Sequence, residues 1–142
     1  MKLPRVLEGI KVLVVDDEAD ARDLLDFILQ KAGATVELAA STGEALALLD
    51  ISRPTILVAD IGMPGEDGYE LIRRVRALSQ PDLALLPAMA LTAYARAEER
   101  AQAFSAGFQS HMTKPVEPSE LIATIARMLE EAGKLRRLGQ SS

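Results

Sequence analysis

Two hydrophobic patterns alternate along this chain from one end to the other. Short runs of Val, Ile, Leu and Ala are typical of strands that are buried on both faces of a sheet. The run Lys11-Val12-Leu13-Val14-Val15 is the clearest, and it stops at two acids. The predicted strands cover residues 11–15, 35–38, 55–59, 85–91 and 109–112.

The segments between these runs change to a helical period. Between residues 18 and 32, apolar side chains recur at three- and four-residue intervals and form one face of a helix. Ser41 is placed to cap the start of the next helix, while Gly33 and Gly107 are placed to end the first and fourth helices. The predicted helices cover residues 18–32, 41–50, 67–78, 96–106 and 118–131.

Five strands that alternate with five helices predict an α/β fold, in which helices cover both faces of a doubly wound parallel sheet. The length of 142 residues is that of one domain. We expect residues 10–132 to form this domain. Residues 1–9 would be an N-terminal extension or linker, and residues 133–142, which include Lys134, Arg136 and Arg137, a flexible C-terminal tail.

The composition excludes several kinds of chemistry. The chain has 21 acidic and 16 basic side chains, and its net charge of −5 argues against binding nucleic acid through general electrostatics. Because it has no cysteine, disulfides, thiolate zinc sites and thiol nucleophiles are excluded. The single histidine, His111, also excludes a metal site built from several histidines.

No targeting or membrane segment is predicted. The N-terminus is charged at Lys2, Arg5 and Glu8 and lacks the apolar stretch of a signal peptide. The longest uncharged apolar run, residues 83–95, contains Pro87 and is shorter than the roughly 20 residues that span a bilayer. We therefore expect a soluble, cytoplasmic protein without membrane contact.

Polar residues suited to a phosphoryl group stand at the carboxyl ends of the predicted strands, where ligands of open α/β sheets bind. Asp16 and Asp17 follow the first strand, Asp60 the third, Thr92 the fourth and Lys114 the fifth. Two carboxylates 4 Å apart repel each other by about 4 kcal/mol at an effective dielectric of about 20, which favours a compensating cation. Oxygen ligands suit Mg²⁺ or Mn²⁺, and Lys114 would add a positive charge.

The carrier of the phosphoryl group is not predicted to be a nucleotide. The chain has no P-loop motif, and no G-x-G-x-x-G follows the first strand. An aspartate at a strand end can itself attack phosphorus and form an acyl phosphate. A phosphorylated aspartate is therefore a candidate product of this site.

Four motifs carry a resemblance to a known family. They are V-L-V-V-D-D-E at residues 12–18, A-D-I-G-M-P-G-E-D-G at 59–68, A-L-T-A at 90–93 and T-K-P-V at 113–116. In this order and spacing, residues 10–131 resemble the receiver domain of two-component response regulators. The resemblance implies a flavodoxin-like (βα)5 fold with strand order 2-1-3-4-5 and a phosphoryl-accepting role in a phosphorelay.

The resemblance also implies roles for individual residues. Asp60 would be the phospho-acceptor. Asp17, Asp60 and the backbone carbonyl of Gly62 would bind Mg²⁺ directly, and Asp16 would act through water. Thr92 and Lys114 would contact phosphoryl oxygens, and Pro115 would form a cis peptide bond with Lys114.

Partners follow from the same resemblance. The donor would be a sensor histidine kinase or a histidine phosphotransfer domain. Phosphorylation would switch the face formed by residues 96–106, 109–112 and 118–131, through which a homodimer is one expected assembly. The stretches L-T-A-Y-A-R and G-F-Q-S-H-M-T-K-P look most like receivers attached to hybrid histidine kinases. With no room for an output domain, we expect a stand-alone receiver or one excised from such a kinase.

Two residues depart from the family pattern. Gly62 stands where members often carry a polar side chain, which bears on the lifetime of the phosphoryl group. His111 replaces the usual Tyr or Phe of a rotameric switch, and an imidazole changes charge between about pH 5 and 8. His111 is therefore either a pH-dependent switch or a packed ring in the core.

Simpler roles compete for other residues. Asp16 and Asp17 could cap a helix, Gly65 and Gly68 could serve only as turn residues, and Tyr94 could contact a partner or cover Thr92.

Two other functions remain as alternatives. One is an aspartyl-phosphate phosphatase or phosphotransferase like the haloacid-dehalogenase group, although that group needs a second acid where Gly62 stands. The other is a pseudo-receiver that is not phosphorylated and acts only as an interaction module.

Overall fold

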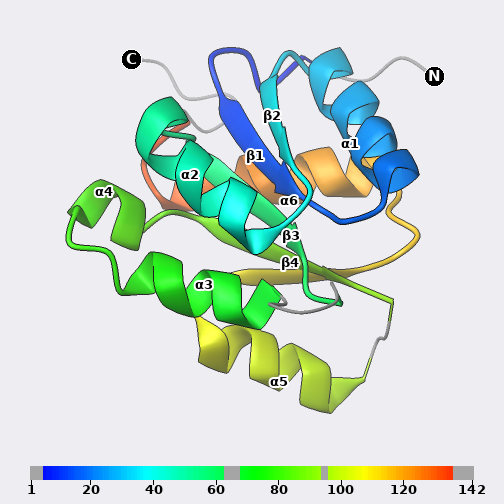
Figure 1. Cartoon of the computed structure of the whole chain (residues 1–142). Coiled ribbons are helices and arrows are strands. Elements are labelled where there is room, and N and C mark those ends of the chain that lie inside the picture. Colours follow the sequence, from blue (N-terminus) through cyan, green and yellow to red (C-terminus); the bar gives the residue numbers. More distant parts are fainter. Residues whose placement is uncertain (1–4, 63–67, 94–95, 136–142) are drawn as a thin grey trace.

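A five-stranded parallel sheet forms the centre of the molecule, with the order β2-β1-β3-β4-β5 (Figure 1). The computed structural model describes residues 5–62, 68–93 and 96–135. The predicted flavodoxin-like fold class and strand order are confirmed. The strands are β1 (Lys11–Val15), β2 (Thr35–Ala39), β3 (Ile56–Asp60), β4 (Ala88–Thr92) and β5 (Ser110–Thr113).

Helices cover both faces of the sheet, as the sequence predicts (Figure 1). The described helices are α1 (Ala19–Lys31), α2 (Thr42–Ser52), α3 (Gly68–Arg76), α4 (Pro81–Ala84), α5 (Ala97–Ala106) and α6 (Pro118–Glu131). Within these residues, no helix is both long and apolar enough to cross a membrane.

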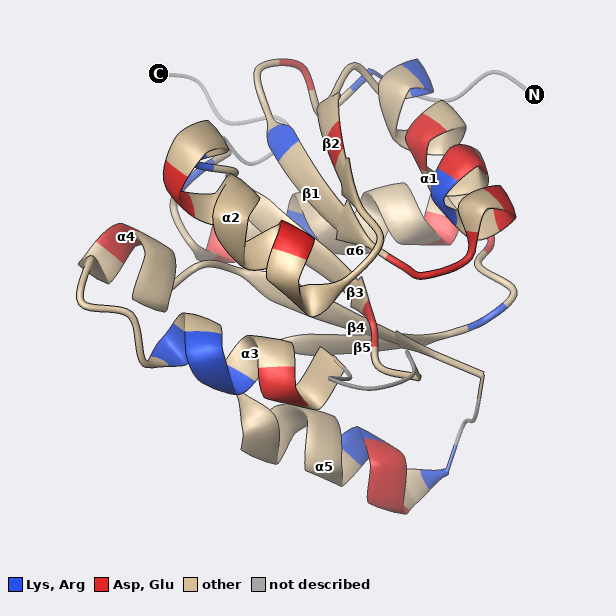
Figure 2. Ribbon diagram, viewed as in Figure 1, with Lys and Arg blue, Asp and Glu red and all other residues tan. Residues whose placement is uncertain are grey.

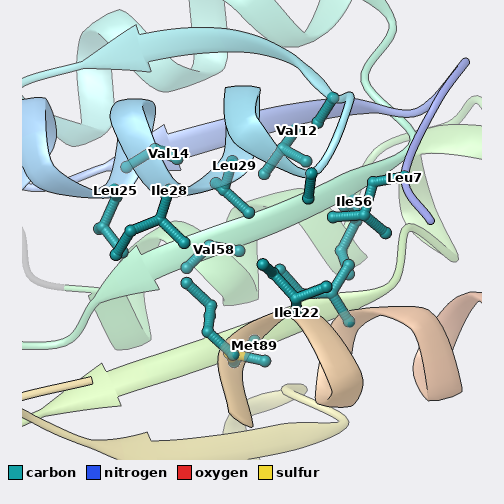
Figure 3. Packing of buried hydrophobic residues seen from close by; sticks show 14 of the residues in the cluster. Leu7, Val12, Val14, Leu25, Ile28, Leu29, Ile56, Val58, Met89 and Ile122 are labelled. Atoms are coloured by element: carbon teal, nitrogen blue, oxygen red, sulfur yellow. The ribbon is translucent and has the colours of Figure 1, made fainter. Parts of the chain in front are cut away.

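Two separate hydrophobic cores result from the alternation of side chains along the strands. On one face Val12, Val14 and Val58 pack against α1 and α6 (Figure 3). On the other face Leu13, Leu57 and their neighbours pack against α2, α3, α4 and α5. Each fully buried aliphatic side chain contributes about 1.5–3 kcal/mol. The first core also contains Leu7, which is 0% exposed although it lies before the first strand.

The structure corrects one stretch of the prediction. Residues 81–84 form the short helix α4, and β4 starts at Ala88 rather than at Leu85. Pro81 suits the first turn of a helix because that position needs no donor, whereas Pro87 has no N–H to offer the sheet. Leu85 is 74% exposed and joins the two elements.

The predicted caps are present. The Ser41 side chain accepts a hydrogen bond of 3.1 Å from the Glu44 N–H and so caps α2. Gly107 ends α5 with a φ of 129°, a conformation that a side chain would strain.

Arg76, at the end of α3, forms hydrogen bonds at the amino-terminal end of the sheet, opposite the carboxyl ends of the strands. Its guanidinium donates to the carbonyl oxygens of Gly107 at 2.8 and 3.0 Å, of Ala84 at 2.9 Å and of Leu86 at 2.6 Å. It also donates to the Gln109 side chain, which accepts the Ala88 N–H. One arginine therefore joins α3, α4, α5 and the starts of β4 and β5.

Gly68, the first residue of α3, packs directly on the end of β3. A Cβ atom there would lie 2.7 Å from the Asp60 carbonyl oxygen and 2.8 Å from the Ile61 Cα. These are backbone atoms and cannot rotate away. The absence of a side chain at Gly68 therefore lets α3 begin beside the last residue of β3.

We predict that Gly68→Ala lowers the free energy of unfolding by about 2 kcal/mol, because the added methyl group overpacks this contact. Urea denaturation measures the change. Gly43→Ala is the matched control, since its Cβ would meet nothing closer than 3.9 Å. Equal stability of Gly68→Ala and the wild type would contradict the contact.

Candidate functional site

Asp60 ends the central strand β3 and is 6% exposed. Its Oδ1 accepts a hydrogen bond of 2.9 Å from the backbone N–H of Gly62. Its Oδ2 lies 3.4 Å from the Nζ of Lys114. The carboxylate is thus held from both sides in a largely dry position at the carboxyl end of the sheet.

Asp16 follows the neighbouring strand β1 and is fully buried. Its Oδ1 accepts the Glu18 N–H at 3.0 Å, and its Oδ2 accepts from the Nζ of Lys114 at 2.9 Å. The N-cap of α1 is Glu18, whose side chain makes no cap hydrogen bond. Asp16 therefore organises the loop before the helix, and a simple N-cap role does not describe it.

Lys114 follows the edge strand β5 and contacts both buried acids at the carboxyl end of the sheet. The Lys114–Pro115 peptide bond is cis, as the resemblance implies, and the Lys114 N–H donates to the Thr92 carbonyl at 2.7 Å. Burial lowers the pKa of Lys114, but the hydrogen bond to Asp16 and the charges of Asp60 and Asp16 outweigh burial and raise it overall. Lys114 is therefore a cation at physiological pH.

Acidic side chains gather where β1 ends. Carboxylate oxygens of Asp16, Asp17 and Glu18 all lie within 4.8 Å of one another, and Asp17 and Glu18 are exposed. Figure 2 shows this acidic stretch leading into α1, close to the acid that ends β3. The donor set consists of oxygen atoms only, which suits a hard divalent cation. The geometry of this acidic cluster therefore suits a divalent cation such as Mg²⁺.

Thr92 ends β4 and is 3% exposed. Its hydroxyl donates to Oε2 of Glu99, in the first turn of α5, at 3.2 Å. One cavity of about 350 Å³ is lined by Thr92, Glu99, Asp60, Gly62 and Lys114. The structure therefore brings the predicted residues of β3, β4 and β5 together around one space.

His111 lies on β5, opposite Ala90 of β4, and is half-buried. Its Nε2 is buried and has no hydrogen-bond partner among the described residues. Burial and the charge of Arg100 lower the pKa of His111, while Glu99 acts in the opposite direction. The ring is therefore mainly neutral at pH 7, and its packing and switch roles stay predictions.

Some residues were not predicted from the sequence. Glu99 and Glu18 line the cavity although neither was a candidate, because an acid in a helix's first turn is common for reasons of capping and dipole alone. Gly65 and Tyr94 lie outside the described residues.

The comparisons with known proteins agree with this geometry. The model of the response regulator receiver domain family matches residues 12–126. The chain therefore belongs to the response regulator receiver family, and it is a phosphoryl-accepting signalling domain.

Relatives include both short and long proteins. An uncharacterized 14.6 kDa protein in the sodA1 3′ region of Leptolyngbya boryana is 50% identical over 121 residues, which are 85% of this chain and 91% of that protein. The transcriptional regulatory protein TrcR of Mycobacterium tuberculosis is 36% identical over 140 residues, which are 96% of this chain and 53% of that protein. The chain thus spans about half the length of such regulators.

Solved structures with the same fold are similar over nearly their whole length. The chemotaxis protein CheY4 of Vibrio cholerae is 33% identical with a TM-score of 0.79, covering 84% of this chain and 98% of that chain. The signal receiver domain of a signal transduction histidine kinase from Syntrophus aciditrophicus is 28% identical with a TM-score of 0.78, covering 94% and 98%.

We predict that Lys114→Gln lowers the free energy of unfolding at pH 7 by about 3 kcal/mol, because two buried acids lose their shared cation. Because the folded-state pKa is raised, this stabilisation is fully present below about pH 10.4 and is lost as the pH rises through the folded pKa. Urea denaturation at several pH values measures both effects.

The exposed Lys134→Gln is the control for the loss of one positive charge. Adding Asp16→Asn to Lys114→Gln should recover part of the stability, since it removes one of the uncompensated charges. An equal loss in Lys134→Gln and Lys114→Gln would contradict the buried ion pair.

Proposed function

We propose that this receiver takes a phosphoryl group on Asp60 from a phosphohistidine of a kinase or phosphotransfer domain. The observation that carries the proposal is the shared Lys114, whose Nζ lies 2.9 Å from Asp16 and 3.4 Å from Asp60 in a cavity that Thr92 also lines. Two buried carboxylates that share one ammonium group keep a net negative charge, which favours a divalent cation. With that cation bound, the site would favour an anionic phosphoryl group.

In the proposed reaction, a carboxylate oxygen of Asp60 forms a bond to phosphorus. The P–N bond to the donor imidazole breaks at the same time, and its electron pair returns to the ring nitrogen. Lys114 and Thr92 would each donate a hydrogen bond to a phosphoryl oxygen. Their contribution is to offset charge on the transferring group, which is the main source of catalysis in phosphoryl transfer.

The acids fit a divalent cation, with Mg²⁺ as the main proposal and Mn²⁺ as an alternative. Asp17, the Asp60 carboxylate and the Gly62 carbonyl would hold it directly. Asp16 would act through water, which agrees with its Oδ2 being engaged by Lys114. A bound cation offsets negative charge between the acids and the phosphoryl oxygens.

The response would be transmitted through Thr92 and His111 to the face formed by α5, β5 and α6. Phosphorylation would favour one member of an existing pair of conformations. A homodimer through this face stays a prediction, and light scattering on beryllofluoride-loaded protein tests it. A cytoplasmic location, and an origin as a stand-alone receiver or as part of a hybrid kinase, also belong to the proposal.

The donor would dock on an apolar groove next to the cavity. This groove, of about 350 Å³, is lined by Leu24, Leu25, Pro115 and Val116 and shares Glu18 and Lys114 with the cavity around Asp60. Leu24 is 54% exposed. Any protein that brings a phosphohistidine to Asp60 must cover the surface around the cavity, and among the described residues this groove is an apolar part of that surface.

We predict that acetyl phosphate or beryllofluoride modifies the protein only with Mg²⁺, and that Asp60→Asn reduces modification at least about tenfold because the attacking oxygen is lost. Intact-mass spectrometry detects the acyl phosphate, and fluorine NMR detects beryllofluoride. Asp50→Asn, at an exposed position of α2, is the control.

Modification without Mg²⁺, or undiminished modification of Asp60→Asn, would contradict the proposal. Multiple turnover on small phosphate esters would favour the phosphatase alternative instead. Absence of both binding and modification would favour the pseudo-receiver alternative.

We predict that Leu24→Asp slows phosphotransfer from a phosphorylated histidine kinase or phosphotransfer protein of the same organism about tenfold, since a buried leucine contributes about 1.5–3 kcal/mol. The rate with acetyl phosphate should not change. Radiolabel transfer measures both rates. Ile51→Asp, on α2 and 81% exposed, is the control, and equal slowing by both variants would contradict docking at this groove.

A further inference from the structure

Glu99 has no role in the reaction proposed above, yet it occupies the same cavity. It lies in the first turn of α5, is half-buried, and lines the cavity together with Asp60, Thr92 and Lys114. The Thr92 hydroxyl donates to its Oε2 at 3.2 Å. An acid beside a site that receives a phosphoryl group needs a physical explanation, because like charges repel.

The donor chemistry of Thr92 supplies that explanation. A hydroxyl has one proton, whereas an ionised carboxylate has only acceptors. The proton on the Thr92 oxygen therefore points to Glu99 in this conformation. A phosphoryl oxygen on Asp60 needs the same proton, so Glu99 and the phosphoryl group compete for one donor.

We propose that Glu99 is a positioning residue that holds the Thr92 hydroxyl in the resting protein and so sets how readily phosphorylation can recruit it. This inference rests on the proposed role of Asp60. Both competing bonds are charge-assisted, which makes the resting bond stronger than one between neutral groups. Phosphorylation must break the hydrogen bond between Thr92 and Glu99, and the free energy of that bond lowers the stability of the active conformation.

Glu99 also lies near the second proposed switch residue. Its charge acts to raise the pKa of His111, against the burial of the ring and the charge of Arg100. The Nε2 of His111 has no partner among the described residues. The charge of Glu99 thus acts on both Thr92, at the end of β4, and His111, near the start of β5.

The experiment compares Glu99→Gln with Glu98→Gln. Glu98 is its neighbour in the same turn and is exposed, so both variants lose one negative charge. Beryllofluoride with Mg²⁺ is the probe, titrated by fluorine NMR. We expect Glu99→Gln to bind it about tenfold more tightly than the wild type, the difference between a charge-assisted and a neutral competitor. Glu98→Gln should stay within about twofold.

A double-mutant cycle separates the hydrogen bond from simple charge repulsion. In a Thr92→Val background, Glu99→Gln should lose most of its effect on beryllofluoride binding, because the shared donor is absent. An undiminished effect in that background, or equal effects of Glu99→Gln and Glu98→Gln, would overturn the proposal.

Two resting-state signals test the contact independently of phosphorylation. His111 is the only histidine, so its ring resonances need no assignment. Glu99→Gln should lower its pKa and should shift the Thr92 methyl resonance, whereas Glu98→Gln should leave the methyl resonance unchanged. If no variant binds beryllofluoride, the role of Asp60 fails, and an unmoved Thr92 methyl resonance would then overturn the role of Glu99 separately.

Discussion

The ammonium group of Lys114 between two buried carboxylates is the interaction on which this structure depends. Asp16 and Asp60 end the neighbouring central strands β1 and β3, and neither could be buried as an anion without a partner. Lys114 follows β5, at the edge of the sheet, and reaches past β4 to both. In the order β2-β1-β3-β4-β5 the two acids stand on adjacent strands within reach of Lys114, so the topology positions the chemistry of the site.

Most of the fold, and the convergence of the candidate residues, were predictable because both follow from position at strand ends. Asp60 and Lys114 are far apart in sequence, but the carboxyl ends of parallel strands meet at one edge. What the sequence did not predict depends on side-chain reach. Arg76 contacts carbonyl groups up to 31 residues away, and Glu99 meets Thr92 across a loop. Neither contact leaves a periodic signal. The helix α4 was missed because one turn is too short to show a period.

Docking of the donor and the response to phosphorylation would involve opposite faces of the sheet. The two faces meet at two consecutive residues, Leu91 and Thr92. Leu91 belongs to the core on the α1 and α6 side and lines the groove proposed for the donor. Thr92 lines the phosphoryl cavity and contacts α5. Because successive side chains of a strand point to opposite faces, the end of β4 is shared by the input side and the response side.

Arg76 has a mechanical consequence for α5. The helix ends at Gly107, whose carbonyl oxygen accepts two hydrogen bonds from the guanidinium, while its first turn carries the contact between Glu99 and Thr92. One end is anchored to α3, and the first turn at the other end carries an exchangeable hydrogen bond. A helix of this length measures about 15 Å, so a rotation of about 10° about its anchored end would move the first turn by about 2.5 Å. Such a rotation would make the helix a lever whose pivot lies beside the amino ends of the strands, opposite the phosphoryl site.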